Sequence, residues 1–294
     1  MQITGSTKLL GVIGHPVTHS LSPLMHNAAL AAMGCDYVYV AFPIAPDRLD
    51  DAITGFEAIG VAGFNITIPH KQTIIPHLAT ISDLAQAVGA VNTVWKSPDS
   101  DGWHGTNTDV AGFIAPLKAL DRDWSSTKIL CLGNGGAARA VVVGAQRLGC
   151  QKIQVIGRRL EKLQTFYDSW QASSLGQQII PKLSIHPWSE LATAIAQADL
   201  IVNTTPIGMH PHTDSSPLSD REAAAIRPGT IAYDLIYIPS PTKFLQQAQA
   251  QGAETINGLE MLVQQGAAAL AIWTNAEVPI AIMRSTLRQH LGFS

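Results

Sequence analysis

The sequence predicts an α/β fold of two domains built on mostly parallel sheets. Short apolar segments such as 8–14 and 128–133 alternate with longer segments of helical spacing. Helices that alternate with apolar strands cover the faces of a parallel sheet. The chain has 294 residues, of which 46% are hydrophobic and 14% are charged. That composition supplies enough apolar surface for one or two cores and argues against disorder.

Strand and helix patterns alternate through the first part of the chain, beginning with a strand over 8–14. A helix over 22–34 follows, in which Ser22 is a candidate cap, Pro23 suits the first turn and Gly34 suits the C′ position. The next elements are a strand over 37–44, an amphipathic helix over 46–60, a strand over 61–69, and two short strands around a turn at 98–102.

The second part of the chain opens with a linking helix over 110–120. A βαβ unit of strand, glycine loop, helix and strand then covers 128–159. Further strands are expected over 198–205, 230–237 and 253–258, with helices between them, and two helices over 259–273 and 278–291 end the chain.

Charge and cysteine usage exclude several classes of protein. The net charge of −3 leaves no basic surface of the kind that binds nucleic acid. The three cysteines, Cys35, Cys131 and Cys150, form no CxxC pair and lie in apolar segments, which favours reduced buried thiols. Neither a signal peptide nor an apolar run of membrane-spanning length is recognisable. We therefore expect a cytoplasmic protein without a membrane partner.

A glycine loop opens the helix of the predicted βαβ unit. The pattern Gly133-x-Gly135-x-x-Ala138 follows one strand directly and precedes a second. In such loops the first glycine permits a tight turn, the second lets backbone approach a pyrophosphate, and the helix N-terminus faces the phosphates. This context favours a dinucleotide site over a glycine turn that only connects two elements.

The second strand of this unit ends in Gly157-Arg158-Arg159. An NAD site would place Asp or Glu there to bind the ribose 2′-hydroxyl. Guanidinium groups instead bind a 2′-phosphate, so the sequence predicts NADP. The alternative is that one or both arginines are only solvated, and it suits Arg159 better than Arg158.

Polar residues also follow the strands of the first part. Ser20 and Ser22 lie between the first strand and its helix, although Ser22 could serve only as a helix cap. His15, His19 and His26 lack a carboxylate or cysteine that would complete a ligand set, so we expect no metal.

The segment FNITIPHK, residues 64–71, begins as a strand with Phe64, Ile66 and Ile68 on the expected core side. Lys71 then lies where the strand ends, and Asn92 and Asp109 follow other short strands. An ammonium, an amide and a carboxylate could thus converge on one site. Lys71 alone would read as a surface lysine, and it is the set that favours a function.

These motifs resemble the shikimate dehydrogenase family. The matching segments follow the family order along nearly the whole chain: GHPVTHSLSPLMHN, FNITIPHK, GAVNTV, GTNTD, GNGGAARA, VNTTPIGM, YDLIY and NGLEMLVQQG. The resemblance implies a substrate-binding catalytic domain over 1–109 plus 259–294 and an NADP-binding Rossmann domain over 110–258, with the active site in the cleft between them. It also implies NADPH-dependent reduction of 3-dehydroshikimate to shikimate, on the route to chorismate and the aromatic amino acids.

The resemblance implies a role for individual residues. Lys71 and Asp109 would be the catalytic pair, with Lys71 donating a proton to the oxygen at C3. The substrate would be bound by the same pair together with Ser20, Ser22, Thr67, Asn92, Tyr237 and Gln265. The cofactor would be bound by Asp83, Gly133, Asn134, Gly135, Gly136, Ala137, Gly157, Arg158, Arg159, Lys162, Leu235 and Gly258.

The chain departs from the family pattern at a few positions. Gly157-Arg158-Arg159 replaces the common Asn-Arg-Thr, Asn134 replaces an alanine, and Glu260 stands where glycine is common. A dual quinate/shikimate dehydrogenase and a non-catalytic metabolite-sensing relative are the alternatives. The paired serines favour shikimate, and the intact Lys71 and Asp109 favour an enzyme. A homodimer is one option for the assembly.

Overall fold

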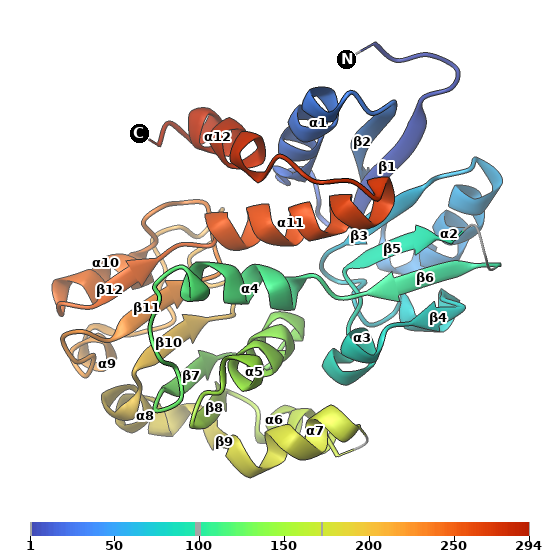
Figure 1. Ribbon diagram of the computed structural model, residues 1–294. Coiled ribbons are helices and arrows are strands. Elements are labelled where there is room, and N and C mark those ends of the chain that lie inside the picture. Colours follow the sequence, from blue (N-terminus) through green and yellow to red (C-terminus); the bar gives the residue numbers. More distant parts are fainter. Residues whose placement is uncertain (1, 98–100, 172, 294) are drawn as a thin grey trace. The chain divides into compact units, whose positions relative to one another are not determined.

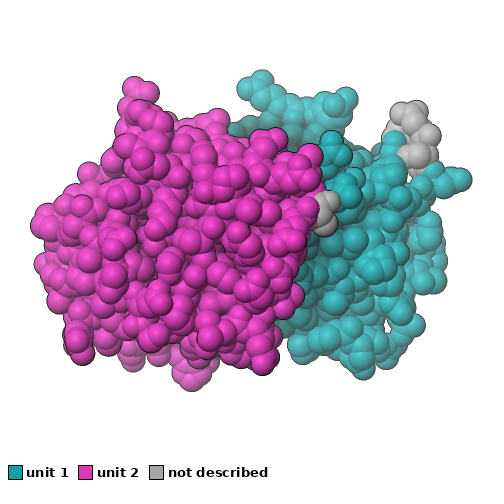
Figure 2. All heavy atoms as spheres, turned by 90° about the horizontal axis from the view of Figure 1, so that it is seen from below, with its two compact units in different colours: residues 1–112, 262–294 teal, residues 113–261 magenta. Residues whose placement is uncertain are grey.

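The computed structural model describes residues 2–97, 101–171 and 173–293 (Figure 1). The chain forms two compact units: residues 1–112 with 262–294 make unit 1, and residues 113–261 make unit 2 (Figure 2). Each unit contains one six-stranded sheet. The predicted two-domain α/β class with parallel-rich sheets is confirmed. No helix within the described ranges has both the length and the hydropathy needed to cross a membrane.

The sheet of unit 1 is mixed. Its strand order is β2 (Tyr37–Pro43), β1 (Lys8–Gly14), β3 (Gly63–Ile66), β5 (Thr93–Lys96), β6 (Trp103–Thr106) and β4 (Thr80–Ile81). β1 pairs in parallel with β2 and β3, whereas β5 runs antiparallel to β3 and β6. β5 and β6 are the two short strands expected from the sequence. Residues 98–100 of the turn between them lie outside the described residues.

Helices of unit 1 begin and end close to the expected positions, except for the short helix α3, which was not predicted from the sequence. They are α1 (Ser22–Met33), α2 (Leu49–Ala58), α3 (Asp83–Val88) and α12 (Ile280–Leu291), to which α4 (Asp109–Lys118) and α11 (Leu259–Thr274) contribute one end each. Gly34 ends α1 in the left-handed conformation with φ 64°, as predicted. The cap prediction for Ser22 is wrong, because Leu21 holds the N-cap position and Ser22 is the first helical residue.

The strand expected over 61–69 is shorter than predicted. β3 ends at Ile66, and the side chain of Ile68 is 64% exposed rather than buried. Pro69 has no N–H, and the carbonyl of Thr67 accepts the N–H of His70, so the chain turns away at this point. Asn65, which lies between Phe64 and Ile66 in β3, is also buried, with 5% of its surface exposed.

Unit 2 has a fully parallel sheet, as the βαβ pattern predicts. Its strand order is β12 (Glu254–Ile256), β11 (Ile231–Asp234), β10 (Leu200–Asn203), β7 (Lys128–Leu132), β8 (Lys152–Gly157) and β9 (Leu183–Pro187). Leu132, Asn203 and Asp234 pair in register, so the carboxyl ends of the central strands form one edge. The sequence did not reveal β9, which is a partly exposed edge strand.

Short helices connect the strands of unit 2. They are α5 (Gly136–Leu148), α6 (Leu160–Asp168), α7 (Ser174–Ile179), α8 (Leu191–Gln197), α9 (Asp220–Ala223) and α10 (Lys243–Ala250). One core cluster joins β7 and β10 to α8 and α10 through fully buried side chains such as Leu132, Ile195 and Ile201. β8 ends at Gly157, so Arg158 and Arg159 lie beyond the strand rather than within it.

Candidate active site

Lys71 and Asp109 form a short ion pair in unit 1. The ammonium donates to Asp109 Oδ2 over 2.6 Å, and the two side chains are 20% and 8% exposed. Lys71 lies in the turn after β3, where its carbonyl accepts the N–H of Val91. Asp109 is the first residue of α4, shortly after the strand β6. A nearly buried carboxylate can hold a partly exposed lysine in place, and that lysine can then act as a proton donor.

The second oxygen of Asp109 is held by Asn92. The Asn92 amide donates to Asp109 Oδ1 over 2.8 Å, and its own carbonyl oxygen accepts the N–H of Thr108 over 2.7 Å. Asn92 is only 2% exposed. The structure thus brings together Lys71, Asn92 and Asp109, the three side chains that were expected to converge from separate parts of the sequence.

Asn107 supports this arrangement and was not singled out from the sequence. Its side-chain oxygen accepts the N–H of Asp109 over 3.0 Å, and its amide donates to the carbonyl of Ala90 over 3.0 Å. The signal was present in the motif GTNTD, where two polar residues precede the carboxylate directly after a strand. Such buried polar residues need partners, and here they fix the start of α4.

Gln265 reaches the same group of side chains from α11. Its Oε1 atom is 3.4 Å from the amide nitrogen of Asn92, a long hydrogen bond, while its own amide donates to the carbonyl of Leu262 over 2.9 Å. Gln265 therefore lies beside Asn92 within unit 1, and its carbonyl oxygen is only loosely engaged.

Ser20, Ser22 and Thr67 lie around the carboxyl ends of β1 and β3. The Ser20 hydroxyl accepts the N–H of Ser22 over 3.3 Å, so Ser20 rather than Ser22 satisfies backbone at the start of α1. The N–H of Thr67 donates to Ile13, the penultimate residue of β1, over 2.9 Å. The hydroxyl of Ser22 has no capping role, so it is not committed to the helix backbone.

Two predicted site residues, Tyr237 and Asp83, belong to a different unit from the other residues predicted to bind the same ligand. Tyr237 belongs to unit 2, in the segment that follows β11, whereas the other predicted substrate residues belong to unit 1. Asp83, predicted to contact the cofactor, is the first residue of α3 in unit 1, beside its cap Ser82.

The glycine loop of unit 2 has the backbone shape that the sequence predicts. Gly133 follows β7 with φ 102°, a conformation that favours glycine. A Cβ at this position would lie 2.9 Å from Thr205 Cγ2 and 3.0 Å from Thr204 Oγ1. Gly135 is the N-cap of α5, and Gly136 and Ala137 form its first turn. The N–H groups of a first helical turn have no partner within the helix and can bind an anion.

The carboxyl end of β8 lies next to this loop. A Cβ on Gly157 would approach the side chain of Asn134 to 3.2 Å. Arg158, Arg159 and Lys162 follow the strand and are exposed. Within the described ranges, none of these three cations forms an ion pair. They are therefore available to an external anion.

Leu235 and Gly258 face each other at the next strand ends. The N–H of Gly258 donates to Ile236 over 3.1 Å, and any Cβ on Gly258 would collide with the Leu235 carbonyl. Asp234, the last residue of β11, is fully buried, and burial raises the pKa of its carboxyl to about 6 despite hydrogen bonds from Thr242, Ile236 and Asn203.

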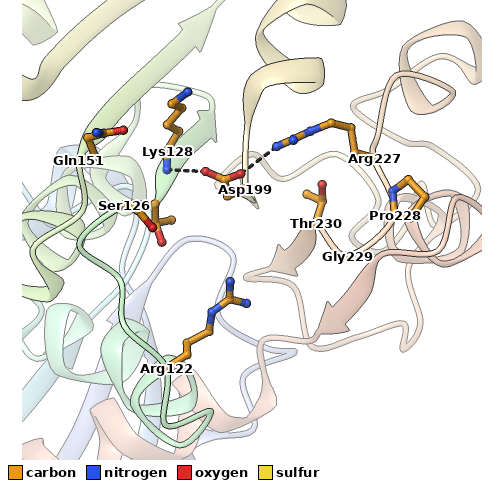
Figure 3. A pocket seen from close by; sticks show the side chains of 10 residues that line it. Arg122, Ser126, Lys128, Gln151, Asp199, Arg227, Pro228, Gly229 and Thr230 are labelled. Carbon is orange, nitrogen blue, oxygen red and sulfur yellow. Dashed lines mark hydrogen bonds and ion pairs between the residues drawn. The ribbon is translucent and has the colours of Figure 1, made fainter.

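A separate hollow lies at the amino ends of the strands of the unit 2 sheet, away from their carboxyl ends. It has a volume of about 380 Å³, and Arg122, Lys128 and Arg227 contribute to its lining. Figure 3 shows Asp199 between the backbone of Lys128 and the guanidinium of Arg227, which it contacts over 2.9 and 2.8 Å. Lys128 starts β7, whereas Gly133 follows its end, so no predicted site residue lines this hollow.

A glycine loop between a parallel strand and a helix, together with a lysine–carboxylate pair, fits the class of α/β oxidoreductases that use a nicotinamide cofactor. A family model for the substrate-binding domain of shikimate dehydrogenase matches residues 12–94, and one for the shikimate 5′-dehydrogenase C-terminal domain matches residues 258–288. The shikimate dehydrogenase (NADP(+)) of Trichormus variabilis is 59% identical over 99% of both chains. The chain belongs to the shikimate dehydrogenase family.

Solved structures agree with this membership. Shikimate dehydrogenase from Aquifex aeolicus superposes with a TM-score of 0.86 at 36% identity, covering 98% of this chain and all of that one. Shikimate 5-dehydrogenase from Thermus thermophilus, solved with NADP(H) and shikimate, gives a TM-score of 0.83 at 33% identity over 96% and 99% of the two chains. The resemblance seen in the sequence is confirmed.

Proposed function

We propose that this chain reduces 3-dehydroshikimate to shikimate with NADPH, a reversible reaction. Its family makes it an NADP-dependent oxidoreductase that acts on a CH–OH group. The observation that carries the assignment to residues is the Lys71–Asp109 ion pair, which Asn92 holds from the other side. The reaction serves the route to chorismate and the aromatic amino acids.

Lys71 is the proton donor in this proposal. When NADPH is bound it supplies a hydride to the C3 carbonyl of the substrate, and negative charge develops on the carbonyl oxygen. The Lys71 ammonium can stabilise that charge and donate the proton. Asp109 orients the ammonium through the 2.6 Å contact, and its other oxygen is fixed by Asn92.

The substrate contacts follow from the side chains around this pair. Ser20 and Ser22 would bind the carboxylate together with Tyr237, and Thr67, Asn92 and Gln265 would bind ring hydroxyls. Two observations support this assignment. The Ser22 hydroxyl has no capping role, and the carbonyl oxygen of Gln265 makes only a long hydrogen bond.

The residues at the strand ends of unit 2 suit NADP. Gly133 leaves a backbone cradle that a side chain would fill, and the N-terminus of α5 presents free N–H groups. Arg158 would meet the 2′-phosphate, with Arg159 and Lys162 adding positive charge nearby. Asn134, Gly135, Gly136, Ala137 and Gly157 would complete the pyrophosphate and ribose contacts, and Asp83, Leu235 and Gly258 would touch the remaining cofactor.

The organisation proposed for the whole chain assigns one task to each part. Residues 1–109 with 259–294 would bind the substrate and carry out the proton transfer, and residues 110–258 would bind NADP. Tyr237 and Asp83 are the exceptions to this division, because Tyr237 would bind the substrate although it belongs to unit 2, and Asp83 would touch the cofactor although it belongs to unit 1.

One assay tests the proposed reaction. Purified chain should oxidise NADPH in the presence of 3-dehydroshikimate, and should do so far more slowly with NADH. In the reverse direction, shikimate should be oxidised with a higher kcat/KM than quinate. Equal efficiency with quinate would indicate the dual enzyme, and ligand-induced thermal shifts without any turnover would indicate the metabolite-sensing alternative.

The proposal extends to location and assembly. The three cysteines are free thiols, and Cys131 and Cys150 are buried, which suits the reducing cytoplasm. We propose a homodimer as the assembly to be tested. Light scattering on the eluting protein should then give twice the chain mass of 31.3 kDa, whereas a value equal to the chain mass would reject the dimer.

A further inference from the structure

A buried tyrosine stands at the start of a hydrogen-bonded path that leads to the Lys71–Asp109 pair. Tyr39 lies on β2 and is 1% exposed, and its hydroxyl donates to Asn65 Oδ1 over 2.7 Å. Burial raises the pKa of Tyr39 well above its ordinary value, against a smaller lowering by the Ser22 hydroxyl. The phenol therefore keeps its proton and acts as a permanent donor.

Asn65 connects the Tyr39 hydroxyl to the start of the neighbouring strand, β5. Its amide nitrogen donates to the carbonyl of Asn92 over 3.0 Å and to Thr93 Oγ1 over 3.1 Å. This carbonyl is the backbone carbonyl of Asn92, which can only accept. The Asn65 side chain must therefore point its nitrogen there and its oxygen toward the phenol. Tyr39 is the hydrogen-bond donor that satisfies that oxygen.

Hydrogen bonds also fix the orientation of the Asn92 side-chain amide. Thr93 Oγ1 donates to Asn92 Oδ1 over 3.1 Å, and the N–H of Thr108 donates to the same oxygen. With its oxygen fixed in this way, Asn92 must turn its nitrogen to Asp109. The path thus runs from Tyr39 through Asn65 and Thr93 to the Asn92 amide that orients the carboxylate.

Tyr39 itself is held from several sides by residues to which the reaction gives no task. The side chain of Asn27 clamps its backbone, donating to the carbonyl over 2.8 Å and accepting the N–H over 2.9 Å. The His26 ring stacks on the phenol ring at a centroid distance of 4.2 Å and an interplanar angle of 9°. Trp273 lies 5.9 Å away and is anchored by its N–H to Val94.

We propose that Tyr39 is a positioning residue for the reaction, which fixes Asn65 and Thr93 so that Asn92 presents its amide to Asp109. The inference rests on the proposed function only in taking Lys71 and Asp109 as the catalytic pair. It gives the motif residues His26 and Asn27 a purpose, which is to hold the ring that starts the path.

Tyr39→Phe removes the hydroxyl and keeps the stacked ring. We expect kcat to fall by about tenfold to a hundredfold through loss of alignment, while KM for NADPH stays unchanged. Tyr233→Phe is the matched control, because the Tyr233 hydroxyl is also buried but has no hydrogen-bond partner among the described residues. Equal kcat in the two variants would overturn the proposal.

A double-mutant cycle separates positioning from general damage to the fold. If Tyr39 acts through Asn92, Tyr39→Phe should lower kcat much less in an Asn92→Ala background than in the wild-type chain. Two fully additive losses would show that the phenol acts by another route and would reject the proposal.

A third measurement does not depend on turnover. In the chain without ligands, the side-chain amide of Asn92 should exchange its protons with water at least about tenfold faster in Tyr39→Phe than in Tyr233→Phe, as followed by NMR. Unchanged exchange would refute the positioning role even if the chain were inactive. If the wild-type chain fails to oxidise NADPH with 3-dehydroshikimate while the two variants still differ in exchange, the proposed function is refuted and the positioning role stands.

Discussion

The side-chain amide of Asn92 donates to Asp109 Oδ1 over 2.8 Å, so the oxygen that Lys71 does not contact is also occupied. The carboxylate is therefore held at both oxygens, and Thr108 fixes the orientation of the amide in turn. A carboxylate fixed in this way can hold the lysine at one place instead of following its motion. Catalysis by Lys71 should depend on this fixed geometry.

Replacing Lys71 should affect chemistry more than binding. Removal of a general acid typically lowers the rate by about 10²–10⁴-fold, so Lys71→Ala should lower kcat by that factor and raise KM much less. Lys96→Ala is the matched control, since Lys96 also forms an ion pair in unit 1, with Glu57 over 3.1 Å, at a more exposed place. Steady-state kinetics would show the difference, and a near-normal kcat without Lys71 would exclude it as proton donor.

Replacing Arg158 should change the choice of cofactor. The guanidinium is exposed and, within the described ranges, forms no ion pair, so its loss should disturb the fold little. Loss of a charge-assisted contact of about 1.5–3 kcal/mol should raise KM for NADPH by roughly tenfold to a hundredfold. KM for NADH should not change. Arg159→Ala measured in parallel shows which arginine dominates, and equal losses with NADPH and NADH would reject the 2′-phosphate contact.

A methyl group on Gly133 should harm both stability and cofactor binding. The added Cβ would be strained at φ 102° and would meet Thr204 and Thr205 at 3.0 Å or less. We expect Gly133→Ala to lower the free energy of unfolding by about 1–3 kcal/mol. NADPH affinity, measured by fluorescence titration, should fall as well.

Gly149 provides the comparison for that experiment. It ends α5 with φ 83°, and a Cβ there would meet no atom within 4 Å. Gly149→Ala should therefore lose stability through strain alone and keep its affinity for NADPH. Normal NADPH affinity in Gly133→Ala as well would contradict the assignment of this loop to the pyrophosphate.

Acid should destabilise the chain through His26. Its ring is fully buried, and burial lowers its pKa from 6.5 to about 3, so the native state keeps it neutral while the unfolded chain takes up a proton below about pH 6.5. The stabilising contribution is complete above that pH and is lost on acidification toward pH 3. Between about pH 6.5 and pH 4.5 it should decrease by about 2 kcal/mol.

His26→Phe keeps an aromatic ring beside Tyr39 and removes this titration. Urea unfolding of both proteins at the two pH values isolates the effect of the imidazole, because all other groups are shared. The stability of the variant relative to the wild type should rise as the pH falls. A pH-independent difference would show that His26 does not remain neutral in the folded chain.

The order of strands and helices could be predicted from local patterns in the sequence. The βαβ unit around Gly133 and the end of α1 at Gly34 are examples, since each depends on spacing and on the conformational freedom of glycine. Predictions failed at the ends of elements, which local patterns place only to within one or two residues. Ser22 is not a cap because Leu21 precedes the first helical turn, and Ile68 is exposed because the chain turns at Pro69.

The α/β class, the parallel sheet of unit 2 and the family could all be inferred from the sequence, because hydrophobic period, glycine loops and motif order are local properties of the chain. That Asn92 holds Asp109 and that Tyr39 begins a path to both follows only from the way the strands pack together. Asn92 and Asp109 are 17 positions apart in the sequence, and Tyr39 and Asn65 are 26 positions apart. A buried hydrogen bond depends on which strands become neighbours, and no local pattern records that pairing.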